Sequence, residues 1–193
     1  MNDARQTASL ASDTLSVADA QRDMRHAYMD GAPGILTSAT VWFVASMVCL
    51  LQSPRQAVWA LFIGGMLIHP VALALLKLLG RPARHARRNP LGTLALSTTI
   101  WMILALPLAY AVSMLRLDWF FPAMLFVIGG RYLTFETLYG MRIYLLFGAV
   151  LALAGYALGS LGASAAAGAF AGAAIEAGFG AFILATARRE RMG

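Results

Sequence analysis

Hydrophobic positions in this chain gather into six long runs, and polar positions gather into the short segments between them. An α-helix needs roughly 20 predominantly apolar residues to cross the hydrocarbon core of a bilayer, and each run is close to that length. The pattern predicts an all-α integral membrane bundle of six transmembrane helices. The predicted ranges are Gly34–Leu51, Ala57–Leu79, Leu91–Leu115, Trp119–Tyr139, Ile143–Leu161 and Ala165–Ala187.

The segment before the first run is polar and mixed in charge. Residues 1–33 do not contain the apolar core of a cleavable signal peptide. Ser16 followed by Asp19 resembles the start of a helix. Two interpretations stay open: a partly disordered tail, or a short helix on the cytoplasmic membrane surface or over the mouth of the bundle. The predicted division is this segment, a transmembrane domain at 34–187 and a basic cytoplasmic tail at 188–193.

The positive charges predict an orientation. Short cytoplasmic loops of membrane proteins carry an excess of Lys and Arg. With the N-terminus in the cytoplasm, twelve cations fall inside, Arg55 and Arg116 fall outside, and Arg131 lies within the fourth run. We therefore expect both termini in the cytoplasm. The twelve inside cations are Arg5, Arg22, Arg25, Lys77, Arg81, Arg84, Arg87, Arg88, Arg142, Arg188, Arg189 and Arg191.

Composition excludes several classes. Hydrophobic residues make up 60% of the 193 residues and charged residues 12%, which is more apolar than a soluble domain. The pI near 10.1 would fit a nucleic-acid-binding protein, but the excess Arg lies in short loops beside the runs, so we expect no nucleic-acid partner. The single cysteine, Cys49, excludes an intrachain disulfide and a cysteine-based zinc motif.

Catalytic motifs are missing. The sequence contains no G-x-S-x-G, HExxH, P-loop, G-x-G-x-x-G or CxxC pattern. The three histidines, His26, His69 and His85, are too few and too scattered for a typical di-metal membrane oxygenase. We expect no cofactor, no metal site and no catalytic residue. Whether the chain is an enzyme stays open, with the missing motifs against it.

Polar side chains within the runs gather in their inner, cytoplasmic halves, whereas the outer halves are almost purely apolar. Because polar groups inside a membrane are costly, they indicate function by default. The pattern predicts a polar pocket open to the cytoplasm. The residues expected to bind a ligand or a proton are Arg131, Glu136, His69, Glu176, Thr134 and Ser97.

The partners of these charges stay open. Arg131 and Glu136 are five residues apart, so they point in different directions and pair poorly within one helix. Contacts between His69 and Glu136, or between Glu176 and Arg131, are both compatible with the sequence. The structural alternatives are an ion pair or a snorkelling pair near the inner interface, and for His69 a hydrogen bond at the kink before Pro70.

Glu176 lies in a stripe of glycines. Gly168, Gly172 and Gly180 share its helix face at a spacing of four. Small residues at this spacing let helix backbones pack closely, either within the chain or between subunits. The stripe therefore favours either a homo-oligomer through the sixth run or a close helix contact inside the chain. For Glu176 itself, a functional role and a structural hydrogen bond both stay open.

Two pairs of runs share a faint pattern. Ser38-Ala-Thr-Val-Trp42 in the first run resembles Ser97-Thr-Thr-Ile-Trp101 in the third, and the runs after them contain the glycine pairs 64–65 and 129–130. The match needs a gap of six residues. A repeated parallel two-helix hairpin and chance similarity between apolar segments are both open interpretations. The glycine pairs favour close packing or mild kinks over broken-helix binding sites.

The segments LFIGGMLIHP, RRNPLGTLAL and WFFPAMLFVIGGRYLTF…TLYGMR resemble a family of small bacterial multi-span membrane proteins without an assigned function. The resemblance covers roughly Met24–Gly155. It implies an inner-membrane protein of bacteria that contacts membrane lipids, and it adds no activity and no site.

Three functions follow as hypotheses. The first is a protein that binds or transports a small solute or ion through the cytoplasm-facing pocket. The second is an enzyme acting on a lipid or isoprenoid, with His69 and Glu136 as acid and base. The third is a structural or accessory subunit that oligomerises through the sixth run.

Overall fold

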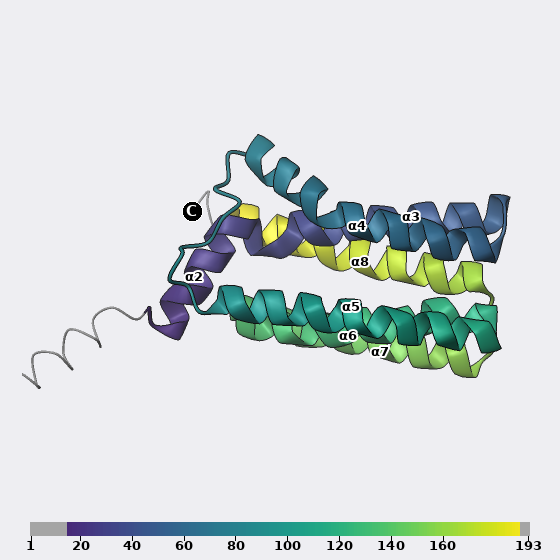
Figure 1. Ribbon diagram of the computed structural model, residues 1–193. Coiled ribbons are helices and arrows are strands. Elements are labelled where there is room, and N and C mark those ends of the chain that lie inside the picture. Colours follow the sequence, from purple (N-terminus) through teal and green to yellow (C-terminus); the bar gives the residue numbers. More distant parts are fainter. Residues whose placement is uncertain (1–14, 190–193) are drawn as a thin grey trace, which may run out of the picture.

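The structure is a computed structural model that describes residues 15–189, and within them every regular element is a helix (Figure 1). Each of the six predicted runs is one helix whose ends lie within three residues of the predicted ones. The elements are α2 (Val17–Tyr28), η1 (Met29–Gly31), α3 (Ala32–Leu51), α4 (Pro54–Leu78), α5 (Leu91–Leu115), η2 (Leu117–Trp119), α6 (Phe120–Tyr139), α7 (Ile143–Ser160) and α8 (Ala165–Arg189).

Several of these helices are suited to a membrane. Within residues 15–189, five helical stretches are long and apolar enough to cross one, and they contain α3, α4, α5, α7 and α8. The remaining long helix, α6, has the same length as α3 but carries Arg131 and Glu136. The chain is therefore a multi-helix membrane protein by its helix lengths and composition.

Short, specific turns make neighbouring helices antiparallel. Pro54 begins α4, and the Ser53 hydroxyl accepts a hydrogen bond of 3.3 Å from the backbone N–H of Gln56, which satisfies an N–H that the helix leaves free. Gly140 ends α6 at φ +65°, a conformation that glycine adopts without strain. These turns bring α3 beside α4 and α6 beside α7.

The long helices form two groups. In the first group α3 packs along α4 and α8, and in the second α6 packs along α7 and α5. Figure 1 shows the groups as two layers, with α8 meeting the second group. The seam between the groups is filled by aromatic rings near the α3–α4 turn, where Phe62 packs edge to face on Phe120 at 5.2 Å.

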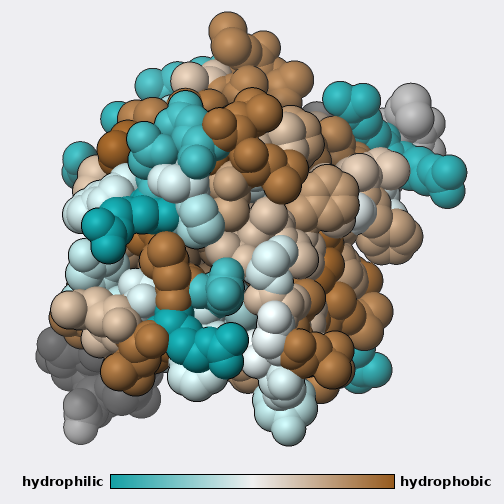
Figure 2. Space-filling view, turned by 90° about the vertical axis from the view of Figure 1, so that its right-hand side faces the viewer, coloured by the Kyte–Doolittle hydropathy of each residue, from teal (hydrophilic) through white to brown (hydrophobic). Residues whose placement is uncertain are grey.

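We call the end with the α3–α4 turn the turn end and the end with α2 the cap end. Figure 2 looks at the turn end and shows hydrophilic residues gathered on it, with hydrophobic residues on the flanks. This distribution fits a bundle whose sides meet an apolar environment and whose end meets water.

At the cap end, α4 and α5 diverge (Figure 1). Pro70 lies inside α4, where it has no N–H for the helix ladder and clashes with the preceding turn. His69 and Pro70 are exposed. We call the cap-end parts of three helices, α4 from His69, α5 up to Thr99 and α6 from Arg131, the fork.

The cap end is covered by α2, which lies across it. The Gln21 amide donates to the Thr137 carbonyl at 2.9 Å, and Arg25 donates to the Tyr139 carbonyl at 2.5 Å. The last carbonyls of a helix have no hydrogen-bond donor within that helix. Side chains of α2 supply these donors to the last turn of α6. The Tyr144 hydroxyl donates to the backbone carbonyl of Asp30 and fixes the link to α3.

The basic loop between α4 and α5 is fastened to α2. The buried Asn89 amide donates to the Ala20 carbonyl at 2.9 Å and to the Asp23 carboxylate at 2.8 Å. The Tyr28 hydroxyl and His85 Nδ1 form a further hydrogen bond of 2.9 Å. Part of the basic loop thus organises the cap end.

Candidate functional site

Glu176 is a carboxyl group buried at the centre of the bundle. Its exposed fraction is 0%. The Tyr132 hydroxyl of α6 donates to Glu176 Oε1 at 3.3 Å, and the Ser38 hydroxyl of α3 lies beside the carboxyl. Glu176 Oε2 is buried without a hydrogen-bond partner, and in the described part of the chain Glu176 forms no ion pair. A buried polar atom without a partner is costly, and this one lies where α3, α6 and α8 meet.

The glycine stripe of α8 explains this burial. A Cβ added to Gly172 would lie 2.6 Å from Cδ2 of Trp42, and one added to Gly180 would lie 3.0 Å from Cγ of Leu36. Both contacts are with α3, so the missing side chains let α8 pack closely on α3. Gly172 therefore faces the inside of the chain and is not free to contact a second copy.

Aromatic rings close the other side of Glu176. Tyr132 stacks on Phe147 of α7 with ring centroids 4.0 Å apart, and Phe147 stacks on Phe179 of α8 at 4.5 Å. Such stacks contribute packing beyond their buried area. The carboxyl group is thus enclosed by rings and helix backbones.

Tyr132→Phe is expected to lower the free energy of unfolding by about 1–3 kcal/mol, because the stack stays while Glu176 loses its hydrogen-bond donor. Unfolding of purified protein in detergent, followed by circular dichroism, measures the change. Tyr110→Phe is the matched control, since Tyr110 is 41% exposed and its ring lies tilted against Trp59, with centroids 6.2 Å apart. Equal losses in both variants would contradict the role given to the Tyr132 hydroxyl.

Arg131 is a half-buried cation without a carboxylate partner. Its Nη2 donates to Thr99 Oγ1 of α5 at 3.2 Å, its Nη1 lies 3.3 Å from the Met102 sulfur, and its guanidinium carbon lies 5.4 Å from the Phe135 ring centroid. Its Nε is buried without a partner. Across residues 15–189 Arg131 makes no ion pair. A neutral hydroxyl, a thioether and a ring compensate a guanidinium only weakly.

Helix geometry directs Arg131 toward the fork. Arg131 follows Phe120 by eleven residues, so the two side chains leave α6 in directions that differ by about 20°. His69 follows Phe62 by seven residues, so these two side chains leave α4 in directions that also differ by about 20°. Phe62 and Phe120 are in contact across the seam. Arg131 and His69 therefore continue these stripes toward the cap end, but α4 bends away there, and in the described residues the contacts of Arg131 are with α5 and α6 and not with His69.

The other predicted site residues lie apart. Thr134 is beside Arg131, and its hydroxyl donates to the Arg131 carbonyl at 2.7 Å. Glu136 lies on the same face of α6 as Gly129 and Leu133. This face contacts α7 near Gly148, so Glu136 points away from Arg131. Ser97 is exposed on a different face of α5 from Thr99.

The contacts considered between His69 and Glu136 and between Glu176 and Arg131 are not formed as ion pairs in the described residues. These polar side chains therefore lie in separate places: Thr99 and Thr134 lie beside Arg131, Glu176 lies at the bundle centre, and His69 is exposed on α4. Tyr132 was not singled out by the sequence. The only feature of the sequence that could have indicated Tyr132 is its hydroxyl group, which lies among the polar residues of the fourth run.

Two open apolar grooves lie elsewhere on the bundle. One lies between α6 and α7 near the turn end, and the other runs between α7 and α8. The predicted cytoplasm-facing pocket is neither of them and stays a prediction. Within residues 15–189 no three His, Cys, Asp or Glu side chains come close enough to hold a metal ion.

Comparison with known proteins gives one match. The model of a family described as a family of unknown function (DUF7010) matches residues 17–186, from the start of α2 almost to the end of α8. No curated protein and no solved structure matches the chain.

Proposed function

The chain belongs to the DUF7010 family of unknown function, and we propose that it is a six-span inner-membrane protein that binds a small anionic solute at Arg131. In this proposal α3 to α8 each cross the membrane, both termini and the cap end face the cytoplasm, and the membrane is bacterial. The twelve inside cations against two outside support this orientation. The short turns between antiparallel helices support the six-span topology.

The absence of an ion pair at Arg131 carries the proposal. An Arg at the centre of a membrane helix costs about 2.5–3.5 kcal/mol on insertion scales, and within residues 15–189 no carboxylate lies within ion-pair distance of this one. Guanidinium groups bind carboxylates and phosphates through two parallel hydrogen bonds. An anionic ligand at the fork would give Arg131 the ion-pair partner that residues 15–189 do not supply, and it would also offer an acceptor to Nε, which is buried without one.

Snorkelling explains Arg131 less well. The residue lies eight positions before the end of α6, or about 12 Å along the axis, and its guanidinium contacts Thr99, Met102 and Phe135. These partners hold it beside α5. The hydroxyls of Thr99 on α5 and Thr134 on α6 would complete the polar side of the ligand site.

Glu176 is proposed as a proton site that serves the fork. It joins the two helix groups, because Glu176 belongs to α8 and its hydrogen-bond donor Tyr132 belongs to α6. Arg131 is the neighbour of Tyr132 in sequence and acts electrostatically on the Glu176 carboxyl. A proton gained or lost at Glu176 would therefore change both the seam and the anion site.

The hairpin repeat of α3–α4 with α5–α6 also stays a proposal. One glycine of each pair lies against the other helix of its hairpin: Gly64 against Val41 of α3, and Gly130 against Trp101 of α5. The geometry gives no support to an acid–base pair of His69 and Glu136, because they lie on stripes directed toward different helices.

The test is stabilisation of the purified full chain in detergent by inorganic phosphate, acetate or succinate, at constant ionic strength and with chloride as reference. At least one of these anions should raise the unfolding temperature, since a ligand at 100 times its Kd adds about 2.7 kcal/mol. Arg131→Gln should lose this rise, and Arg55→Gln, at an exposed turn-end cation, should keep it. No rise with any anion, or the same rise in Arg131→Gln, would overturn the proposal.

A further inference from the structure

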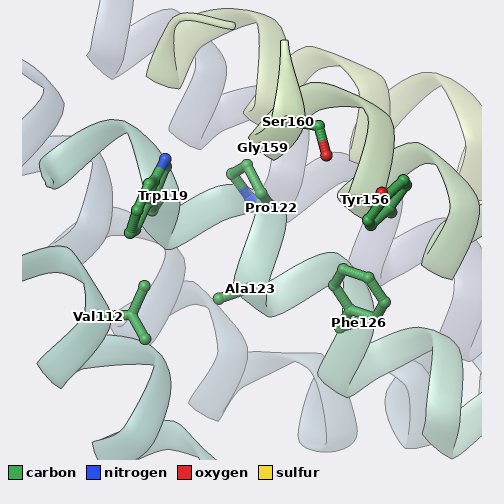
Figure 3. Close-up of a pocket in the computed structure, with 9 residues that line it drawn as sticks. Val112, Trp119, Pro122, Ala123, Phe126, Tyr156, Gly159 and Ser160 are labelled. Atoms are coloured by element: carbon green, nitrogen blue, oxygen red, sulfur yellow. The ribbon is translucent and has the colours of Figure 1, made fainter. Parts of the chain in front are cut away.

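An apolar groove of about 380 Å³ lies on the flank of the bundle near the turn end. Figure 3 shows its lining side chains converging from α5, η2, α6 and α7. The larger ones are Val112, Trp119, Pro122, Phe126 and Tyr156. The groove plays no part in the proposed anion site, because neither Arg131 nor Glu176 lines it.

Two glycines of α7 create the groove. A Cβ on Gly155 would lie 2.7 Å from the Pro122 carbonyl oxygen, so this glycine is the point where α7 touches α6. One turn later, a Cβ on Gly159 would lie 3.6 Å from the Pro122 Cβ, which is ordinary contact. The floor at Gly159 is therefore open, and a longer side chain at this position would fill the space.

The turn end of the groove carries an aromatic ring and a cation. Arg116 follows the last residue of α5, is exposed, and holds its guanidinium carbon 5.3 Å from the centre of the Trp119 ring. Tryptophan at the end of a membrane helix prefers the level of the lipid headgroups. Arginine recognises phosphate through its forked N–H groups.

From these observations we infer that the groove binds a glycerophospholipid, with one acyl chain along the groove and the phosphate at Arg116. The distance from Trp119 to Phe126 along α6 is about 10 Å, so a stretch of acyl chain lies against both rings. The apolar lining matches the chain, and the exposed cation next to Trp119 matches the phosphate. A second protein copy would need an anionic group of its own at Arg116.

Native mass spectrometry of the purified full chain tests this assignment with two probes at equal concentration. The probes are a phosphatidylglycerol and a diacylglycerol with the same acyl chains. The wild-type protein should retain one phosphatidylglycerol more strongly than the diacylglycerol. Gly159→Leu should reduce this retention about tenfold or more, which corresponds to about 1.4 kcal/mol.

Two further variants keep the test decisive. Arg116→Gln changes none of the residues that line the groove, so it should lower retention of phosphatidylglycerol to that of diacylglycerol. Gly65→Leu is the matched control, because Gly65 is exposed on α4 and a Cβ there meets nothing within 4 Å; it should bind like the wild type.

Unchanged lipid retention in Gly159→Leu, or equal retention of both probes by the wild-type protein, would overturn the assignment. A wild-type dimer that Gly159→Leu converts to a monomer, without loss of lipid, would assign the groove to a second copy instead. None of these measurements uses the small anions of the Arg131 experiment. A failure of the lipid assignment can therefore be distinguished from a failure of the proposed anion site.

Discussion

Gly129→Ala is expected to lower the free energy of unfolding by about 3 kcal/mol or more, at the upper end of what overpacking costs. A Cβ at Gly129 would lie 2.8 Å from the Gly148 carbonyl oxygen and 3.1 Å from the Ala152 backbone nitrogen. Both are backbone atoms of α7, so no side-chain rotation relieves the clash. Chemical or thermal unfolding in detergent, followed by circular dichroism, measures the loss.

Gly130→Ala is the matched control, one residue further along α6. Its Cβ would meet only the Trp101 ring at 3.5 Å, which is ordinary contact. Alanine also has the higher helix propensity, by about 0.8–1.0 kcal/mol, so this variant should be as stable as the wild type or slightly more stable. Equal destabilisation by both substitutions would contradict the close approach of α6 and α7.

Gly172→Leu is expected to prevent folding. Trp42 is 1% exposed and fills the space where the new side chain would lie. The ring has no room to move without separating α3 from α8. The yield of monodisperse protein in size-exclusion chromatography, together with circular dichroism, measures this result. Gly178→Leu, on the same helix with nothing within 4 Å of its Cβ, should fold normally.

The same variant also separates two uses of the glycine stripe. If the stripe were a subunit contact, Gly172→Leu would stay folded and change only from an oligomer to a monomer. That outcome would contradict the α3–α8 packing described here. Oligomerisation through another face of α8 stays a separate prediction.

The hydropathy pattern could predict the helices because it depends on local sequence alone. A run of apolar residues sets the length of each helix, and residues such as Pro54 and Gly140 set its ends. The range Leu91–Leu115 is identical in the prediction and in the structure. The short turns also follow directly, because too few residues remain between runs for any other connection.

The side-chain partners could not be predicted in the same way. The sequence showed that polar residues share one depth in their runs, and a single pocket was the simplest interpretation. Depth does not fix the direction of a side chain: Arg131 and Glu136 lie on different sides of α6, and Ser97 and Thr99 on different sides of α5. The rotation of each helix depends on packing between distant segments.

Contacts between residues that are far apart in the sequence could not be predicted either. Tyr132 and Glu176 are 44 residues apart, and Gln21 and Thr137 are 116 apart. No spacing rule pairs such residues. The stretch from Ser16 to Met29 did carry a helix signal, but its place over the end of α6 depends on Gln21 and Arg25 reaching carbonyls that only the folded bundle exposes.

The most direct test of the anion site is the charge selectivity of thiol labelling at Thr99→Cys, beside Arg131, with Cys49 replaced by alanine. Anionic and cationic methanethiosulfonate reagents are compared, each relative to its rate with a free thiol in solution. The anionic reagent should react about tenfold faster, which corresponds to about 1.4 kcal/mol. Arg131→Gln should abolish this preference. A thiol that reacts with neither reagent, or a preference that is unchanged without Arg131, would contradict a water-accessible anion site at the fork.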